Sequence, residues 1–285
     1  MTTEILIYGA VTSAIYALLA VGFTLVFGVA RILNLAHGAF YMLGAYLTYL
    51  FATVVGLPLL AAALLAIGCT AALGWATERW LIRPHRQVQM AVLMVTFAFL
   101  LVVEQVLLVS FGSEVINVPA FVHAKATLAG VDIGGQQLLT FAVALVTLVL
   151  LWLLIQHTRA GSAILALSQD PLAAQYVGIP VNRAYGGVVA LAAALAALAG
   201  VMAAPFLSAS PAMAMPALIK AFAVVIVGGL GSLSGSILAA ILLGYAETAV
   251  AYWVSSSWTE VVSLAAVLLT LLLRPAGLRG RRAAF

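Results

Sequence analysis

Apolar stretches long enough to cross a bilayer recur along this chain from one end to the other. A membrane-spanning helix needs about 20 mostly apolar residues to cross a hydrocarbon core roughly 30 Å thick. Eight such units can be marked, and they lie at residues 5–27, 35–55, 57–77, 88–111, 138–155, 184–207, 217–253 and 258–273. Because 66% of the residues are hydrophobic and only 7% are charged, a soluble globule could not hide this much apolar surface. The sequence predicts an all-α, polytopic transmembrane helical bundle that forms a single domain over residues 1–285.

The seventh unit, residues 217–253, is too long for one ordinary span. Four glycines interrupt it, at Gly228, Gly229, Gly231 and Gly235. They leave about 11 apolar residues before the break and about 18 after it. We expect a broken or re-entrant hairpin whose two ends face the same side of the membrane.

Arginines gather in four segments between the apolar units. These are Arg31; Arg79, Arg83 and Arg86; Arg159 and Arg183; and Arg274, Arg279, Arg281 and Arg282. Basic residues near span ends are retained on the cytoplasmic side. With an outside N-terminus, all four segments lie inside and residues 112–137 lie outside. The first unit lacks a basic leader and a short cleavage site, so we expect a retained span and not a signal peptide.

The sequence shows no motif for catalysis or for metal binding. It contains no phosphate-binding Gly-x-x-x-x-Gly-Lys-Ser/Thr loop, no His/Cys set with metal-ligand spacing and no Gly-x-Ser-x-Gly elbow. The single cysteine, Cys69, lies in an apolar run. The net charge of +4 is spread over the ends of the apolar units, so it does not indicate a nucleic-acid surface. We therefore expect no enzymatic activity, no cofactor and no metal in this chain.

Two breaks in the apolar pattern are the best candidates for a solute pathway or gate. Residues 34–38 read Asn-Leu-Ala-His-Gly, and residues 228–235 hold the glycines of the seventh unit. Non-helical backbone at membrane depth is tolerated only where protein covers it or where it lines a wet cavity. His37 could touch a solute, although a histidine at a helix start is more often a structural hydrogen-bonding group. The pathway or gate residues predicted from the sequence are Asn34, His37, Gly38, Thr96, Glu104, Gly228, Gly229, Gly231 and Glu247.

Charged residues inside apolar spans are costly and usually face protein or water. Glu247 lies deep in its unit and could belong to the wall of a path. Glu104 could do the same, but it lies near the outer end of its span and could simply reach the membrane interface. Lys220 is expected at the outer rim, where the seventh unit begins.

The two breaks also lie within segments of similar sequence. Residues 23–46 and 222–245 both run from a phenylalanine through a glycine-interrupted polar break to a Gly-Ala-Tyr or Gly-Tyr ending. The spacings differ, so this is a weak indication of the internal repeats found in transporters.

The segment 156–183 is long for a connection inside a compact bundle. Asp170 followed by Pro171 predicts a turn and a fresh helix start within it. The pattern alone leaves two alternatives open, an amphipathic surface helix and a binding segment.

Several motifs occur together, in order, over nearly the whole chain. They are Asn34-Leu35-Ala36-His37-Gly38, Gly44-Ala45-Tyr46, Thr158-Arg159-Ala160-Gly161, Ala173 through Gly178-Ile179, Ala199-Gly200, Lys220-Ala221-Phe222 and Gly228-Gly229-Leu230-Gly231-Ser232. This set resembles the permease subunits of high-affinity branched-chain amino acid ATP-binding-cassette (ABC) importers, in particular the shorter of the two paired permease types.

The resemblance implies a multi-pass permease of the bacterial cytoplasmic (inner) membrane. Its partners would be membrane lipid, a second related permease, two cytoplasmic ATPase subunits that hold ATP and magnesium, and an external or periplasmic substrate-binding protein. Segment 156–183 would then be the cytoplasmic coupling segment. Its implied ATPase-coupling residues are Arg159, Gly161, Asp170, Ala173, Ala174, Gly178 and Ile179. Urea, amides or aromatic acids remain alternative solutes, and a stand-alone secondary transporter remains an alternative function.

Overall fold

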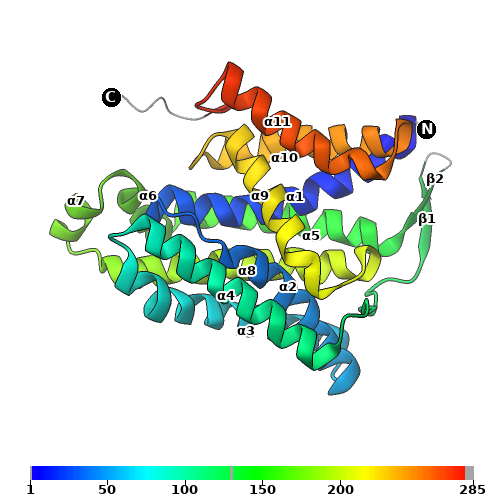
Figure 1. The fold of residues 1–285 in the computed structure, drawn as a ribbon, viewed down its shortest axis with the longest axis horizontal. Helices are drawn as coiled ribbons and strands as arrows, with labels where there is room; N and C mark the ends of the chain where they lie inside the picture. Colours follow the sequence, from blue (N-terminus) through cyan, green and yellow to red (C-terminus); the bar gives the residue numbers. More distant parts are fainter. Residues whose placement is uncertain (1, 129–130, 280–285) are drawn as a thin grey trace.

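Helices make up most of the computed structural model, which describes residues 2–128 and 131–279 (Figure 1). The helices are α1 Thr2–Ala30, α2 Ala36–Tyr49, α3 Leu59–Thr77, α4 Gln89–Phe111, α5 Gly135–His157, α6 Arg159–Gln169, α7 Pro171–Tyr176, α8 Val181–Leu207, α9 Ala214–Gly228, α10 Leu233–Trp253 and α11 Thr259–Leu273. Short π-helical turns extend α2 over Leu50–Val54 and α3 over Glu78–Ile82. A two-stranded antiparallel hairpin, β1 Lys125–Leu128 and β2 Val131–Gly134, is the exception to the helical pattern.

Within the described residues, eight helical stretches are long and apolar enough to cross a membrane. The predicted helical membrane bundle is therefore confirmed, but the eight stretches are not the eight predicted units. The seventh unit is two spans, α9 and α10, so it is broken into a pair of helices whose far ends face the same side. The second unit is not among the eight: α2 and its π-helical turn form one helix over residues 36–54, which is long enough but not apolar enough to qualify.

The connections between helices sort to two ends of the bundle. At one end, the side chain of Gln89 contacts the carbonyl of Arg31, and the amide of Leu278 donates to Val227. Every arginine that the structure describes lies at this end, which we call the arginine end; Arg281 and Arg282 lie outside the described residues. Figure 1 shows α6 and α7 at this end and the N-terminus with the β-hairpin at the other, which we call the hairpin end. This is the arrangement that the orientation argument requires.

Small residues let the central helices approach closely. α8 is rich in alanine and glycine, and a Cβ at Gly200 would collide with the carbonyl of Tyr41 in α2. α1 runs antiparallel to α10 along its length: Gly9 lies against Tyr245, and Thr24 bonds Ser236 with 2.6 Å between the hydroxyl oxygens. Tight backbone contact of this kind stabilises helix pairs in lipid. α1 and α8 are accordingly central, whereas α11 is peripheral: 78%, 72% and 6% of their most apolar windows are buried.

The helix α2 begins inside the bundle and not at its surface. After α1 ends at Ala30, the chain turns at Arg31, which has a φ of 52°, and runs back among the helices. The His37 side chain, in the first turn of α2, meets the carbonyl of Leu19. Leu19 lies about 16 Å before the end of α1 at 1.5 Å per residue. α2 therefore has a buried N-terminus, and its π-helical turn continues it without a break to Val54.

Candidate functional site

The break at residues 34–38 is buried except for Leu35, which is partly exposed. Asn34 is 2% exposed and His37 is 1% exposed. Asn34 Oδ1 accepts a hydrogen bond from the Ala36 amide at 3.1 Å, and the Leu35 amide donates to Thr96 Oγ1 at 3.2 Å. Two side chains thus satisfy backbone donors that a helix N-terminus leaves unpaired. Asn34 Nδ2 itself is buried with no hydrogen-bond partner among the residues described.

His37 ties this break to α1. Its Nε2 lies 2.9 Å from the carbonyl oxygen of Leu19, and its ring meets the ring of Phe23 edge to face at 5.6 Å. Phe23 also meets Phe222 of α9 edge to face at 6.0 Å. Gly22 allows the contact, since a Cβ there would lie 3.0 Å from His37 Cε1. The geometry matches the structural hydrogen-bonding role that a histidine at a helix start usually has.

Gly38 allows α2 to cross α9. A Cβ on Gly38 would collide with the carbonyl oxygen of Ala214 and lie 3.1 Å from the Cβ of Leu218. The predicted pathway residues Asn34, His37, Gly38 and Thr96 are therefore brought together at one buried junction of α1, α2, α4 and α9.

The second break lies at the arginine end. Gly229 and Gly231 have φ angles of 101° and 82°, and Leu230 between them is 48% exposed. The amides of Leu278 and Arg279 donate to the carbonyls of Val227 and Gly228, which fixes the C-terminal segment beside the turn. The expectation of backbone at membrane depth is thus wrong for this break. A tight turn between two complete spans needs the left-handed conformations that glycine supplies.

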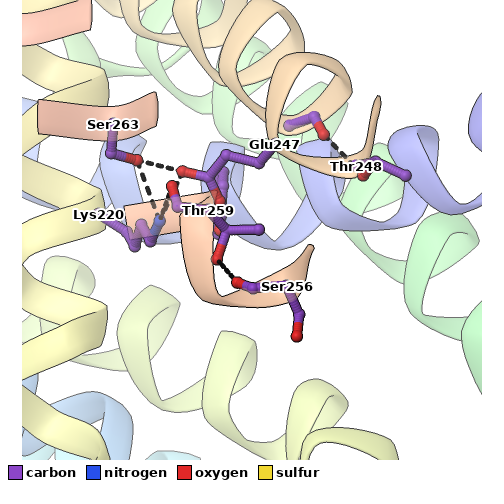
Figure 2. A network of polar contacts seen from close by, with 8 residues as sticks. Lys220, Glu247, Thr248, Ser256, Thr259 and Ser263 are labelled. Carbon is purple, nitrogen blue, oxygen red and sulfur yellow. Dashed lines mark hydrogen bonds and ion pairs between the residues drawn. The ribbon is translucent and has the colours of Figure 1, made fainter. Parts of the chain in front are cut away.

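Glu247 belongs to a buried polar network that joins four helices (Figure 2). Lys220 Nζ of α9 lies 2.6 Å from Glu247 Oε1 of α10 and also donates to the carbonyl of Thr259 and the hydroxyl of Ser263, both at 3.1 Å. Tyr16 of α1 donates to Glu247 Oε2 at 2.5 Å, and Ser263 of α11 donates to Oε1. The expected place of Lys220 at the outer rim is wrong, because its side chain is only 12% exposed.

Sequence reasoning missed the two side-chain hydroxyl groups of this network, those of Tyr16 and Ser263. Neither carries a charge, and both lie in apolar runs, where a single hydroxyl group does not indicate a polar site. The pairing of Lys220 with Glu247 did leave a signal, because opposite charges stand on either side of the glycine break in one apolar unit. Ionisable groups inside a membrane usually pair with one another.

A cavity of about 360 Å³ lies beside the network, between α1, α2, α9 and the end of α8. Its wall includes Tyr16, Leu19, Tyr41, Phe206, Ala217 and Lys220. No predicted pathway residue lines it directly. Two of them contact residues of the wall. His37 bonds the carbonyl of Leu19, and Glu247 bonds Tyr16 and Lys220.

Glu104 lies apart from these groups. It is partly buried on α4, where Leu101, Val102 and Val106 are 47–60% exposed. Its position in the last two turns of α4 is the one expected of a side chain that reaches the membrane interface at the hairpin end.

The predicted coupling segment forms two capped helices, α6 and α7, at the arginine end (Figure 1). Thr158 caps α6, with its Oγ1 accepting from the Gly161 amide at 3.0 Å. Asp170 caps α7 by accepting from the amides of Leu172 and Ala173 at 2.8 and 3.1 Å. Each cap fixes the direction in which its helix leaves the preceding chain.

The end of α7 is fixed as well. Gly178 has a φ of 83°, and the amide of Ile179 donates to the carbonyl of Ala174 at 3.1 Å, which is a glycine C-cap. A Cβ on Gly161 would collide with the carbonyl of Ile155, so α6 folds tightly back against the end of α5.

The implied coupling residues of this unit differ in exposure. Ala174, one of the implied coupling residues, is only 3% exposed and packs into the core, so its side chain does not lie on the exposed face. Asp170, Ala173, Gly178 and Arg159 are exposed, and Ile179 is partly buried. Leu172, Tyr176 and Val177, which the sequence reasoning did not single out, are 68%, 90% and 77% exposed.

Comparisons with known proteins agree with this architecture. The sequence model of one family, described as branched-chain amino acid transport system / permease component, matches residues 5–271. The chain is 31% identical to the high-affinity branched-chain amino acid transport system permease protein BraD of Pseudomonas aeruginosa, over 97% of this chain and 95% of that protein. It is 28% identical to the permease protein LivH of the corresponding Escherichia coli system, over 96% and 94% of the two chains.

A solved structure shares the fold. The structure described as PsaBC from Streptococcus pneumoniae in complex with Fab matches with a TM-score of 0.57, and the match covers 97% of each chain. At 15% identity this likeness concerns the fold alone.

Proposed function

The chain belongs to the branched-chain amino acid permease family, and from this premise we propose that it is the translocation subunit of an ABC importer for branched-chain or similar small amino acids. A permease of this kind performs no chemistry. It alternates between conformations that expose a solute path to one side or to the other.

The observation that carries the proposal is the α6–α7 unit. It is capped at three points, it lies at the arginine end, and it presents Leu172, Tyr176 and Val177 to the surroundings. Large exposed apolar side chains grouped outside the spans mark an interaction site. An ATPase subunit bound to this face would move α6 and α7 together as one rigid unit, which we call the lever. The caps keep the two helices from changing shape when they are displaced.

The lever connects directly to the centre of the bundle. α7 is followed by α8, one of the most buried spans, which packs against α1 and α2. Displacement of α7 would therefore reach the junction at Asn34 and His37 through a chain of tightly packed helices. Closely packed helices transmit small shifts instead of deforming.

The remaining partners follow from the same proposal. ATP and magnesium belong to two separate cytoplasmic ATPase subunits, and this chain contributes no catalytic group and no cofactor site. A second related permease completes the path, and an external or periplasmic binding protein delivers the solute at the hairpin end. The assembly lies in the bacterial inner membrane, where the arginine end faces the cytoplasm.

The test is purification of the complex in mild detergent, followed by reconstitution in lipid vesicles with leucine and its binding protein. We expect two ATPases and a second permease to co-purify, and ATP to drive leucine uptake. Urea, short amides and aromatic acids serve as competitors that test the solute alternatives. A chain that purifies alone and carries leucine without ATP would instead favour a secondary transporter.

The lever is tested with Tyr176→Ser combined with Val177→Ser. We expect ATP-driven uptake to fall at least tenfold, because the ATPases lose two apolar contacts with α7. Val254→Ser is the matched control, since Val254 is 65% exposed at the hairpin end. Asp170→Lys and Gly178→Val should uncouple uptake from ATP hydrolysis by loosening α7 without touching its apolar face. Normal uptake in all of these variants would remove the lever assignment.

A further inference from the structure

The cavity between α1, α2, α8 and α9 has the size of a small-molecule site. Its volume of about 360 Å³ lies near the lower limit of ligand pockets, which begin at about 300 Å³. It extends along α1 from Thr12 to Leu19. Ser208 and Ser210, in the connection between α8 and α9, form its rim at the hairpin end.

The wall of the cavity is apolar with isolated hydroxyl groups. Ile15, Leu19, Phe206 and Ala217 supply hydrocarbon surface. Tyr41 also belongs to this wall, and its hydroxyl makes no hydrogen bond within the part of the chain that the structure describes. An apolar wall with a few placed polar groups suits a solute that has an aliphatic part and a polar part.

The charged groups beside the cavity, Lys220 and Glu247, are bonded to each other and to neighbouring groups and not to its interior. Lys220 contributes its side chain to the wall, but its ammonium group has acceptors for all three protons, on Glu247, Thr259 and Ser263. Glu247 in turn accepts from Tyr16, Lys220 and Ser263. A lysine commonly lines apolar space with its methylene chain while its charged head is satisfied elsewhere. A solute in the cavity therefore meets no free ion and is not held tightly.

The inner end of the cavity is closed. Below Leu19, the His37 side chain bonds the Leu19 carbonyl and Phe23 packs against the imidazole ring. Leu19, Phe23 and His37 are each 2% exposed or less. The cavity thus ends on the buried junction at residues 34–38, and its rim faces the hairpin end.

We propose that this cavity is the chamber in which the solute waits between the two sides of the membrane, and that it accepts small zwitterions with branched aliphatic side chains. The aliphatic group packs against Leu19, Phe206 and Ala217, and the Tyr41 hydroxyl bonds the polar end. The inference rests on the proposed importer function. It adds a location, a contact residue and a reason why binding is weak enough for passage.

The experiment uses the complete complex in lipid vesicles and compares two variants with a control. Ala217→Phe fills the chamber and should lower leucine uptake at least tenfold. Tyr41→Phe removes one hydroxyl and should raise the half-saturating leucine concentration severalfold. Ala72→Phe is the control, because Ala72 is an exposed alanine on α3 away from the cavity, and it should leave uptake unchanged. Uptake within twofold of the unsubstituted complex in an assembled Ala217→Phe complex would overturn the chamber.

A second measurement decides the matter if Ala217→Phe fails to assemble. Cys69→Ala removes the chain's single cysteine, and Ala217→Cys then places one thiol in the chamber. We expect a water-soluble thiol reagent to label this thiol and leucine to slow the labelling. A thiol that leucine does not protect would overturn the chamber while ATP-driven uptake by the unsubstituted complex still supported the importer. Leucine protection without ATP-driven uptake would support the chamber and overturn the importer.

Discussion

The two breaks in the apolar pattern look alike in sequence and differ in depth. Both follow a phenylalanine-containing helix, both contain glycine, and in both a side chain accepts a hydrogen bond from an amide at the start of the next helix. The first, at residues 34–38, is buried at a junction of four helices, whereas the second, at residues 228–232, is a turn at the arginine end with Leu230 half exposed. Composition therefore indicates where helices end. The path of the connecting chain decides whether the ends meet lipid, water or protein.

The two helix pairs next to these breaks are accordingly joined and stabilised in different ways. The α9–α10 pair is joined by a surface turn and held together inside the membrane by the ion pair of Lys220 and Glu247. The α1–α2 pair is joined by a chain that returns into the bundle, where side chains satisfy its backbone. We expect substitutions in the first break to change both stability and transport. We expect substitutions in the second to have small effects.

The largest effect should come from the ion pair that stabilises α9 and α10 away from their turn. Lys220→Met leaves Glu247 as an uncompensated buried charge, which costs about 4 kcal/mol of unfolding free energy. Adding Glu247→Leu should recover more than half of that loss, because the second substitution removes the orphaned charge. Unfolding in detergent, followed by circular dichroism, measures both. A double variant less stable than Lys220→Met alone would contradict this account.

Next in size is the close approach at the deep break. Gly38→Val places a branched side chain against the Ala214 carbonyl and should cost about 3 kcal/mol through overpacking. The matched control is Gly68→Val on α3, where a Cβ would meet nothing within 4 Å. A shift in the unfolding midpoint should appear in the first variant alone. Equal midpoints would mean that the deep junction is loosely packed.

A smaller effect is expected at the two helix caps, which offer a direct comparison between the breaks. Asn34→Ala removes the acceptor of the buried Ala36 amide and should cost about 2 kcal/mol, because water cannot replace it. Ser232→Ala removes the acceptor of the Gly235 amide at the arginine end and should cost about 0.5 kcal/mol. Thermal unfolding of both variants in one detergent gives the order. A larger loss for Ser232→Ala would reverse the assignment of depth.

The smallest effect concerns the surface turn itself. Gly231→Ala forces a side chain into a left-handed conformation and should cost about 1 kcal/mol. Leucine uptake should remain within twofold of the unsubstituted complex, since the turn only joins two spans. A tenfold loss of uptake at unchanged protein level would show that the surface turn belongs to the gate.

Much of the fold could be predicted from the sequence, because lipid constrains it strongly. Apolar length located the spans, and arginine position sorted the connections to one end. The glycines at 228–231 correctly marked a break in the seventh unit. The depth of a break could not be predicted. It depends on the return of residues 31–35 into the bundle, which no local pattern specifies.

The candidate site was predictable in part for the same reason. Polar or small residues at Asn34, His37 and Gly38 stood out against apolar neighbours, and they do gather at one junction. Tyr16, Tyr41 and Ser263 did not stand out, since a single hydroxyl in a span becomes informative only when its neighbours on other helices are known. The burial of Ala174 could not be predicted, because an alanine in a short helix carries no sign of which face is buried.

We propose that the deep break borders the translocation path, because the chamber ends on it, and that the surface break does not. After Cys69→Ala, Leu35→Cys and Ser232→Cys each place one thiol in one of the breaks. The measurement is the rate at which a water-soluble thiol reagent labels each variant, at rest and during ATP-driven leucine uptake. We predict that Leu35→Cys is labelled much faster during uptake than at rest, and that Ser232→Cys is labelled at the same rate in both states. A Leu35→Cys variant that transports leucine while its thiol stays unreactive throughout would contradict the claim.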